Sequence, residues 1–411
     1  MRLRHTGGTT VHLGYCTNVH PAEDLAGILT QLDDYAVPVR ETLGADLLGL
    51  GLWLAAPVAA ELAADPALRR RLRAELTARG LEVVTLNGFP YAAFQAPVVK
   101  GDVYHPDWTT PQRLAYTLDL ARVLADLLPD DAARGSISTL PLAWRHPWND
   151  ERADLAARNL DALAAGLADV HRHTGRTVRV GFEPEPGCVV ETTAQAAACL
   201  SRVDTGWLGV CLDLAHLACG WEQPAEALNQ LRTAGLPVVK VQLSAALQAA
   251  DPLAAADTLQ AYVEPRFLHQ TRTSAAVAAD DPADPRFAAD DLDAALSTLL
   301  PNSEPGRQPT RAWRVHYHVP LHAPPEEPLT STLPVLRTAL RELLGGERAG
   351  CDHLDVETYT WGVLPVARRP RSDAELAAGI AAELAFARDE LVALGLTPAG
   401  RPAPAGTGVR R

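Results

Sequence analysis

Carboxylates and histidines recur at the ends of short apolar runs in the second half of the chain. Glu183 ends the run TVRVGFE, and Asp213 ends the run LGVCLD, with His216 three residues later. An apolar run that stops at Pro or Gly is typical of a buried parallel strand, and parallel barrels carry their reactive groups at the carboxyl ends of such strands. We therefore expect Glu183, Asp213 and His216 to lie on one rim of a sheet.

Three more side chains of the same kinds follow later in the chain. His316 and His318 alternate in WRVHYHV, which places them on one face of an extended segment, and Glu357 ends the run HLDVE. Taken singly, each has an ordinary alternative, because an Asp before a His is a common helix cap and HxH is a common strand face. Together, oxygen and imidazole ligands suit Zn²⁺, Mn²⁺, Co²⁺ or Mg²⁺. Their repeated position at strand ends predicts a divalent-metal site.

Composition limits the partners of this 411-residue chain. The formal net charge of −13 argues against nucleic acid or an anionic membrane surface as the main partner. The longest apolar run, residues 47–60, contains Pro57 and is shorter than the roughly 20 residues of a membrane span. The six cysteines form no CxxC pair and the first residues contain no apolar signal core, so we expect a cytoplasmic protein. Small-molecule metabolites and other proteins remain as candidate partners.

Apolar runs alternate with helix-period segments along the whole chain. We count eight such units, which begin at VHLGYC, LGLGLWLA, LEVVTLN, GSISTLP, TVRVGFE, LGVCLD, PVVKVQLS and HLDVET. Alternation of this kind is typical of a parallel sheet covered by helices, and eight units favour a closed (β/α)₈ TIM barrel. No GxGxxG follows the first run, which disfavours an open dinucleotide-binding sheet. We predict one domain over residues 1–396 and a disordered tail over 397–411.

Two irregular segments interrupt this pattern. Residues 89–108 lose periodicity and are rich in aromatic residues, and residues 245–311 form a long insertion after the seventh predicted strand. The segment WRVHYHV is assigned to this insertion, although a ninth barrel strand there would break the predicted closure. Because both segments leave the carboxyl ends of strands, we expect them to cover the mouth of the barrel and to exclude water from a pocket.

Polar residues near the ends of other predicted strands are candidate substrate contacts. They are Asn18, His20, Asn87, Arg145 and Lys240. Ordinary loop caps are an equal alternative for the first four, whereas Lys240 is a Schiff-base lysine, a substrate contact or, most often for such a position, the partner of a buried acid. Glu185, two residues after Glu183, is interpreted as part of a solvated corner.

This set of residues resembles the metal-binding pattern of the xylose isomerase-like TIM barrels, which include sugar isomerases, epimerases and the endonuclease IV type of repair nuclease. The resemblance implies that Glu183, Asp213, His216 and Glu357 surround one or more divalent metals, with Glu183 and Glu357 also serving as an acid–base pair. His316 and His318 resemble the Asp-x-His pair of the nuclease type, with His in place of Asp. The sequence departs from the pattern at the seventh strand, where Gln242 stands in place of a His ligand.

Longer phrases resemble one branch of this superfamily, the EboE-type metabolite traffic proteins. The phrases are YCTNVHP, LNGFPYAAF, VKGDVYHPDW, STLPLAWR, GFEPEPGC, CLDLAH, RFLHQT and DVETYTW. The resemblance implies a cytoplasmic protein of a bacterial ebo-type gene cluster that makes or moves a secondary metabolite.

Three functions stay open at this point. The first is a metal-dependent sugar isomerase or epimerase acting on a small polyhydroxylated or phosphorylated metabolite. The second is a non-catalytic metabolite carrier, or a partner of other proteins of the cluster. The third is an endonuclease IV-like phosphodiesterase, which the net charge of −13 disfavours.

Overall fold

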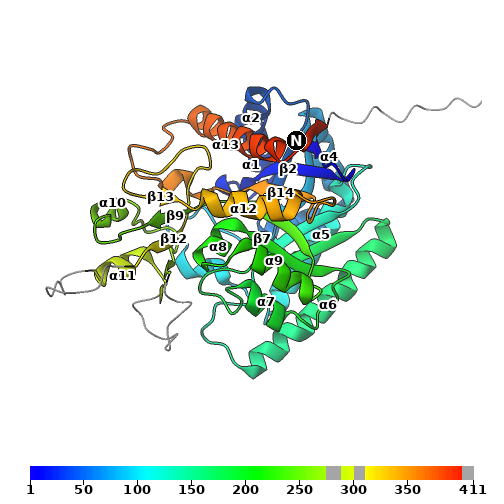
Figure 1. Cartoon of the computed structure of the whole chain (residues 1–411). Coiled ribbons are helices and arrows are strands. Elements are labelled where there is room, and N and C mark those ends of the chain that lie inside the picture. Colours follow the sequence, from blue (N-terminus) through cyan, green and yellow to red (C-terminus); the bar gives the residue numbers. More distant parts are fainter. Residues whose placement is uncertain (275–287, 300–310, 400–411) are drawn as a thin grey trace, which may run out of the picture.

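The computed structural model describes residues 1–274, 288–299 and 311–399. Its centre is a closed barrel of eight parallel strands (Figure 1). These strands are β2 (Thr10–Cys16), β3 (Leu48–Trp53), β4 (Leu81–Asn87), β5 (Gly135–Thr139), β6 (Val178–Phe182), β7 (Leu208–Asp213), β8 (Val238–Leu243) and β14 (His353–Val356). β14 pairs with both β8 and β2, so the barrel closes without a ninth strand. The predicted (β/α)₈ barrel is confirmed.

Helices form the outer layer, and α6 (Asp150–Thr174) shows how the sequence dictates them. Asn149 caps its first turn by accepting a hydrogen bond from the Arg152 amide, and Gly175 ends it with a φ of 69°. Leu160, Leu163, Leu167 and Val170 recur at helical spacing, and this stripe is buried against the barrel. The other helices of this layer are α1 (Leu25–Gln31), α2 (Val37–Thr42), α3 (Ala56–Ala64), α4 (Pro66–Ala78), α5 (Pro111–Leu127), α7 (Thr193–Cys199), α8 (Leu214–Cys219), α9 (Pro224–Thr233), α12 (Leu333–Leu344) and α13 (Asp373–Ala393).

A second, antiparallel sheet follows β8 and lies beside the barrel (Figure 1). Its strands, in the order β11-β10-β12-β9-β13, are β11 (Ala288–Ala289), β10 (Thr271–Thr273), β12 (Trp313–His318), β9 (Ala246–Ala249) and β13 (Thr330–Ser331), with the short helices α10 (Ala256–Gln260) and α11 (Leu292–Ser297) between them. WRVHYHV is therefore part of the excursion after the seventh barrel strand, as predicted. The excursion runs beyond residue 311 because β13 pairs with β9. Residues 275–287 and 300–310 of the predicted insertion lie outside the described part.

The two ends of the described chain meet in one edge of the main sheet. β1 (Arg2–Arg4) pairs antiparallel with β2, and β15 (Thr397–Ala399) pairs antiparallel with β1. The prediction of a disordered tail from residue 397 is thus wrong for its first three residues, because the open edge of β1 offers backbone groups that need partners. Residues 400–411 lie outside the described part.

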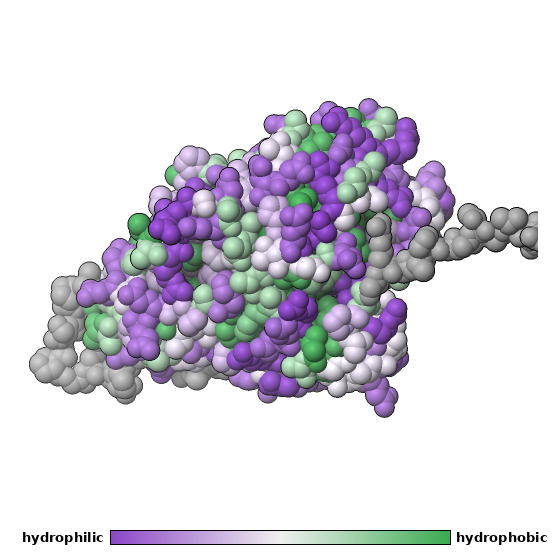
Figure 2. Space-filling view, turned by 90° about the horizontal axis from the view of Figure 1, so that it is seen from above, coloured by the Kyte–Doolittle hydropathy of each residue, from purple (hydrophilic) through white to green (hydrophobic). Residues whose placement is uncertain are grey.

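Apolar side chains at the surface are scattered among the described residues. No helix within the described ranges is long and apolar enough to cross a bilayer. On the face seen in Figure 2, apolar residues lie in groups between hydrophilic ones. The large exposed apolar side chains, Val98, Leu253, Val366 and Val392, come from separate parts of the chain.

Candidate active site

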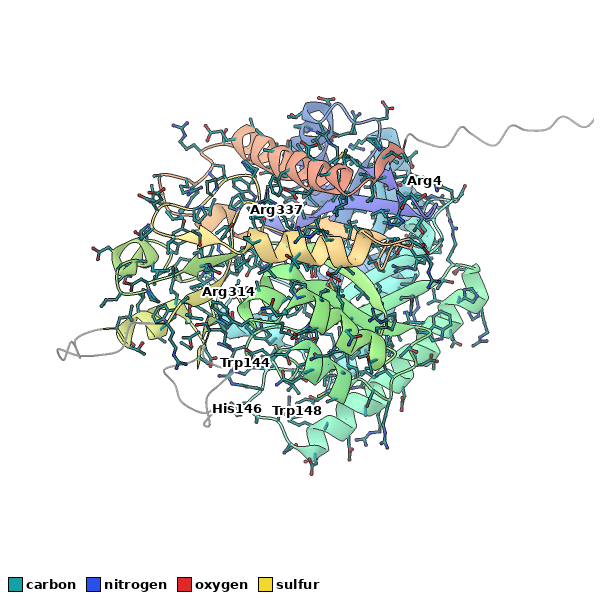
Figure 3. The ribbon with its side chains drawn as sticks, viewed as in Figure 1. Arg4, Trp144, His146, Trp148, Arg314 and Arg337 are labelled. Carbon is teal, nitrogen blue, oxygen red and sulfur yellow. The ribbon has the colours of Figure 1, made fainter. Side chains whose placement is uncertain are left out.

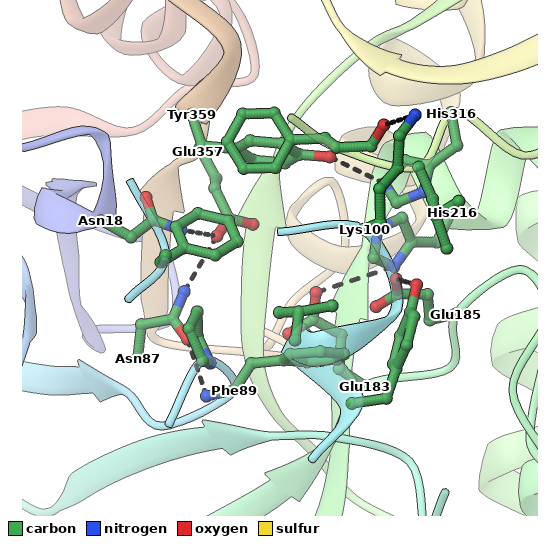
Figure 4. Close-up of a pocket in the computed structure, with 16 residues that line it drawn as sticks. Asn18, Asn87, Phe89, Lys100, Glu183, Glu185, His216, His316, Glu357 and Tyr359 are labelled. Carbon is green, nitrogen blue, oxygen red and sulfur yellow. Dashed lines mark hydrogen bonds and ion pairs between the residues drawn. The ribbon is translucent and has the colours of Figure 1, made fainter. Parts of the chain in front are cut away.

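A cavity of about 50 Å³ lies at the carboxyl ends of the barrel strands (Figure 4). Its walls combine residues from strand ends with both irregular segments: Asn18, Asn87, Phe89, Pro90, Phe94, Lys100, Val103, Tyr104, Glu183, Glu185, His216, Phe267, Leu268, His316, Glu357 and Tyr359. Residues 89–108 and the excursion after β8 therefore cover the same mouth, as predicted. Together these two segments form the roof of the site.

Six acids and imidazoles converge at this cavity. Glu183, Asp213, His216, His316, His318 and Glu357 are all buried. Their ligand atoms form three overlapping groups, each within 4.8 Å of one another: Glu183 with Asp213 and His216, His216 with His316 and His318, and Asp213 with His318 and Glu357. The structure thus brings together the residues that the strand ends singled out, and each group has donors that could hold a metal ion.

The local structure around Asp213 orients two side chains of this cluster. It ends β7 and caps α8, where its Oδ1 accepts hydrogen bonds from the amides of Ala215 at 2.8 Å and His216 at 2.9 Å. Ser244 donates to the same oxygen at 2.8 Å. The cap directs Asp213 into the rim and places His216 within the first turn of α8, so the three-residue spacing has a structural reason.

Glu357 is held by three side-chain amides. Asn18 Nδ2 and Asn87 Nδ2 donate to its Oε1 at 2.8 and 2.9 Å, and Gln242 Nε2 donates to its Oε2. Burial and the nearby charge of Asp213 raise the pKa of Glu357 to about 8, while the hydrogen bond from Asn18 opposes this rise. Asn18 and Asn87 therefore reach the site as the sequence predicted, and both orient a carboxylate.

Three atoms of the cluster have no hydrogen-bond partner although they are buried. They are Glu183 Oε2, Asp213 Oδ2 and His318 Nε2. Burial and the charges of Glu357 and Asp213 raise the pKa of Glu183 well above its usual range. Buried acceptors without a partner and neighbouring carboxylates both destabilise the folded state. A divalent cation bound between them would offset both effects. The residues present thus fit a metal ion.

Gln242 and Lys240 lie next to the site and are bonded to neighbouring side chains. Gln242 Oε1 accepts a hydrogen bond from Cys211 Sγ at 3.1 Å while its Nε2 donates to Glu357, so both amide atoms already have a protein partner. Lys240 Nζ lies 3.0 Å from Asp355 Oδ2, and neither side chain reaches the cavity. The roles of Gln242 as a ligand and of Lys240 as a substrate contact stay predictions, and the pair with Asp355 agrees with the buried-acid interpretation of Lys240.

His20 and Arg145 do not line the cavity, contrary to prediction. The His20 ring stacks on Tyr35 with centroids 4.1 Å apart, and Tyr15 OH is 3.1 Å from its Nε2. Arg145 pairs with Asp290 at 2.5 Å and lies over the ring of Trp144, which Figure 3 labels on the segment between β5 and α6. Residues beyond a strand end take their direction from the loop, which strand periodicity does not specify.

The sequence interpretation missed the polar group around Glu185. This residue is buried, and Tyr104 OH donates to its Oε1 at 2.6 Å. Burial raises the pKa of Glu185 to about 8, although the Tyr104 hydrogen bond lowers it. The expected solvated corner is therefore wrong, because residues 89–108 fold over it. Tyr359 OH, 3.4 Å from His316 Nε2, was also missed.

The chain matches one protein-family model and is similar to several solved structures. A family model described as xylose isomerase-like TIM barrel matches residues 40–257. Similar solved structures include an L-ribulose 3-epimerase (13% identity, 94% of this chain and 96% of that chain, TM-score 0.48). A D-psicose 3-epimerase crystallised in the presence of D-fructose has 13% identity over 92% of this chain and 99% of that chain, with a TM-score of 0.48. The IolI protein with a binding zinc atom has 13% identity over 93% and 99% of the two chains, with a TM-score of 0.47. A search of curated protein sequences gives no match.

Proposed function

The chain belongs to the xylose isomerase-like TIM barrel family, and from that premise we propose that it is a divalent-metal-dependent isomerase or epimerase of a small polyhydroxylated or phosphorylated metabolite. One observation carries the proposal: Glu183 and Glu357 line one cavity, and three buried ligand atoms of the cluster there have no hydrogen-bond partner. The side chains available to hold the ion are Glu183, Asp213, His216, His316, His318 and Glu357. Zn²⁺, Mn²⁺, Co²⁺ and Mg²⁺ all suit this family of donors.

The two glutamates supply the proton transfer. A bound cation would stabilise the negative charge that develops on adjacent oxygens of a hydroxy-ketone. Glu183 Oε2 has no hydrogen bond in the structure and is free to take the proton from the hydroxyl-bearing carbon next to the carbonyl group. Glu357, fixed through both oxygens by Asn18, Asn87 and Gln242, returns a proton from another strand of the barrel.

The roof supports this chemistry by keeping water out. Phe89, Phe94 and Phe267 line the cavity, and Phe94 and Phe267 pack with ring centroids 5.1 Å apart. Exclusion of water strengthens every charge interaction in the cavity and protects an enediolate from side reactions.

The biological setting is proposed from the sequence phrases. Their resemblance to the EboE-type metabolite traffic proteins supports a cytoplasmic enzyme of an ebo-type gene cluster, where it processes a precursor of a secondary metabolite. Other proteins of the cluster are its proposed partners.

Exchange of a carbon-bound proton tests the proposal even while the product is unidentified. The metal-loaded protein is incubated in D₂O with ketoses, aldoses and their phosphates, and deuterium beside the carbonyl is followed by NMR. We expect incorporation with at least one compound, and its loss in Glu183→Gln and Glu357→Gln variants of unchanged melting temperature. Incorporation that persists in both variants would contradict the assigned roles.

A non-catalytic carrier is the second candidate. The observation in its favour is Gln242, which occupies the seventh-strand ligand position and uses both amide atoms in hydrogen bonds to Cys211 and Glu357. A carrier binds a metabolite, detected as a rise in melting temperature, without any exchange of deuterium. A phosphodiesterase is disfavoured because Lys100, the only Lys or Arg among the described residues lining the cavity, already contacts Phe267 O and Asp291.

A further inference from the structure

Tyr359 lines the cavity two residues after the acid–base residue Glu357 (Figure 4). Its ring packs against Phe94 and Phe267, with ring centroids 5.3 and 4.8 Å away. Its hydroxyl oxygen lies 3.4 Å from His316 Nε2, which is longer than the roughly 3 Å of a firm hydrogen bond. The ring is therefore fixed, whereas the hydroxyl hydrogen has no strong acceptor.

Most of the other hydrogen-bond donors at the cavity are already taken. Lys100 Nζ has three oxygen partners, and Asn87 Nδ2 has two partners. Tyr104 donates its one hydroxyl hydrogen to Glu185 at 2.6 Å. A tyrosine hydroxyl keeps its hydrogen at neutral pH, so Tyr359 offers a donor in a cavity rich in carboxylates.

The buried carboxylate of Glu383, on helix α13 outside the barrel, holds the backbone around Tyr359. Thr358 Oγ1 donates to Glu383 Oε1 at 2.7 Å, and Trp361 Nε1 donates to Glu383 Oε2 at 3.0 Å. The amide of Leu321, in the segment that follows β12, also donates to Oε1 at 2.9 Å. One carboxylate thus binds residues on both sides of Tyr359 and joins them to the neighbouring segment.

A further bond fixes the residue between these two anchors. Thr360 Oγ1 donates to His318 O, so the 3₁₀ helix η4 (Tyr359–Val363) is tied to β12 as well as to α13. Thr358, Thr360 and Trp361 each have a side-chain bond that points away from the cavity, and the Tyr359 side chain lies on the cavity side. A donor held in this way needs no reorganisation when a charge develops beside it.

We propose that Tyr359 donates a hydrogen bond to the carbonyl oxygen of the bound metabolite, and that Glu383 is the positioning residue that fixes this donor. The inference deepens the proposed function and rests on it. When Glu183 takes the proton from the hydroxyl-bearing carbon, the electron pair of that C–H bond forms a C=C bond. The carbonyl π pair then moves to the oxygen, Glu183 holds the proton, and Tyr359 stabilises the oxygen without losing its own hydrogen.

This donor narrows the class of substrate. A carboxylate or an imidazole lone pair accepts hydrogen bonds from hydroxyl groups, whereas the Tyr359 hydroxyl is suited to an oxygen that only accepts. The cavity should therefore bind hydroxy-ketones more tightly than the alcohols in which the carbonyl group is reduced.

Binding of glycolohydroxamate, which resembles an enediolate in shape and charge, tests the donor without any turnover. The dissociation constant is measured by calorimetry on metal-loaded, full-length protein. Tyr359→Phe should weaken binding about 10- to 100-fold, because a hydrogen bond to a charged oxygen is lost. Tyr317→Phe is the matched control, since it removes a buried hydroxyl from a residue that is not among the described residues lining the cavity. It should bind as wild type does.

A double-mutant cycle tests whether Glu383 acts through Tyr359. Glu383→Gln keeps the shape but turns one acceptor oxygen into an amide donor, so one of its three donors loses its acceptor. It should weaken hydroxamate binding less than Tyr359→Phe does, and the double variant should bind no more weakly than Tyr359→Phe alone. Glu390→Gln, on the same helix, is the control and should bind normally. Additive losses would overturn the positioning role. If Glu383→Gln does not fold, Thr358→Val removes a single donor and takes its place in the cycle.

The outcomes separate this inference from the proposed function. Equal hydroxamate affinity in wild type and Tyr359→Phe would overturn the inference, while deuterium exchange in wild type would still support the isomerase. Weaker hydroxamate binding by Tyr359→Phe, with no exchange in wild type, would support the donor and contradict the proposed function. Wild type that binds no hydroxamate would overturn the inference.

Discussion

Lys240 Nζ lies 3.0 Å from Asp355 Oδ2 inside the barrel, one layer below the acid and histidine cluster. The pair fits because β2 and β3 carry glycines there. A Cβ on Gly51 would stand 1.7 Å from Asp355 Oδ2, and one on Gly14 would stand 3.0 Å from Oδ1. The glycines of LGLGLW and VHLGYC thus make room for a buried charge pair that supports the floor of the site.

Removing one partner of this pair should destabilise the fold strongly. Lys240→Met leaves the Asp355 carboxyl buried without its counter-charge, and we expect the free energy of unfolding in urea to fall by about 3–5 kcal/mol. The double variant Lys240→Met, Asp355→Asn should recover much of that loss. Arg337→Met, which breaks the partly exposed pair with Glu390 at 2.7 Å, is the control and should cost at most about 1 kcal/mol. Equal losses in single and double variants would rule out a stabilising charge pair.

Glu185 should make the metal-free protein less stable as the pH rises. Its pKa in the folded state is about 8, above the ordinary value of 4.5, so the folded protein keeps a proton that the unfolded chain releases in between. The associated stability is present below pH 4.5 and is lost toward pH 8, at about 1.4 kcal/mol per pH unit for one proton. Glu185→Gln keeps an acceptor for Tyr104 but cannot ionise. Urea unfolding at several pH values should show a shallower decline in this variant, and parallel curves would contradict the burial argument.

Lys100 should hold the two segments of the roof together. Its Nζ donates to Phe267 O at 2.8 Å and pairs with Asp291 Oδ2 at 2.5 Å, joining residues 89–108 to the second-sheet excursion. The amides of residues 99 and 100 donate to Arg266 O at 2.8 and 2.7 Å. In Lys100→Met we expect these two amides to exchange with D₂O about ten- to a hundredfold faster, because a charged hydrogen bond contributes about 1.5–3 kcal/mol. Amide exchange in β6 and β7 should not change. An unchanged exchange rate at residues 99 and 100 would show that Lys100 does not hold the two segments together.

Gln242 gives a prediction opposite to that of the sequence pattern. By the pattern alone, Gln242→His restores a missing ligand and tightens the metal. In the structure, the substitution instead removes donors and acceptors from Glu357 and Cys211, which should cost about 1–3 kcal/mol of stability. Zn²⁺ affinity, measured by competition with a chelator, should not rise. A gain of about tenfold in Zn²⁺ affinity, or 1.4 kcal/mol, would show that the seventh barrel strand carries a ligand position after all.

The barrel and the identity of its rim acids could be predicted because both follow from period and position. A buried parallel strand is an apolar run, and its last residue reaches the rim, which located Glu183, Asp213 and Glu357. The HxH alternation likewise predicted that His316 and His318 would lie on one face, and the structure places both in one group of possible ligands.

The remaining features depend on contacts between distant segments. Glu185 is buried only because Tyr104 folds over it, and β15 exists only because β1 offers an edge. His20 and Arg145 turn away from the cavity because Tyr35 and Asp290 hold them elsewhere. No local pattern of residues encodes these pairings.

Elemental analysis of the purified protein tests the central claim most directly, because the proposed chemistry requires a divalent ion at the six-residue cluster. The protein is expressed with Zn²⁺, Mn²⁺, Co²⁺ and Mg²⁺ in the medium, analysed, stripped with chelator and melted. We predict one transition-metal ion per chain, a lower melting temperature after stripping and its recovery when Zn²⁺ is returned. Protein that contains no metal, and whose melting temperature none of the four ions raises, would contradict the account and favour the carrier.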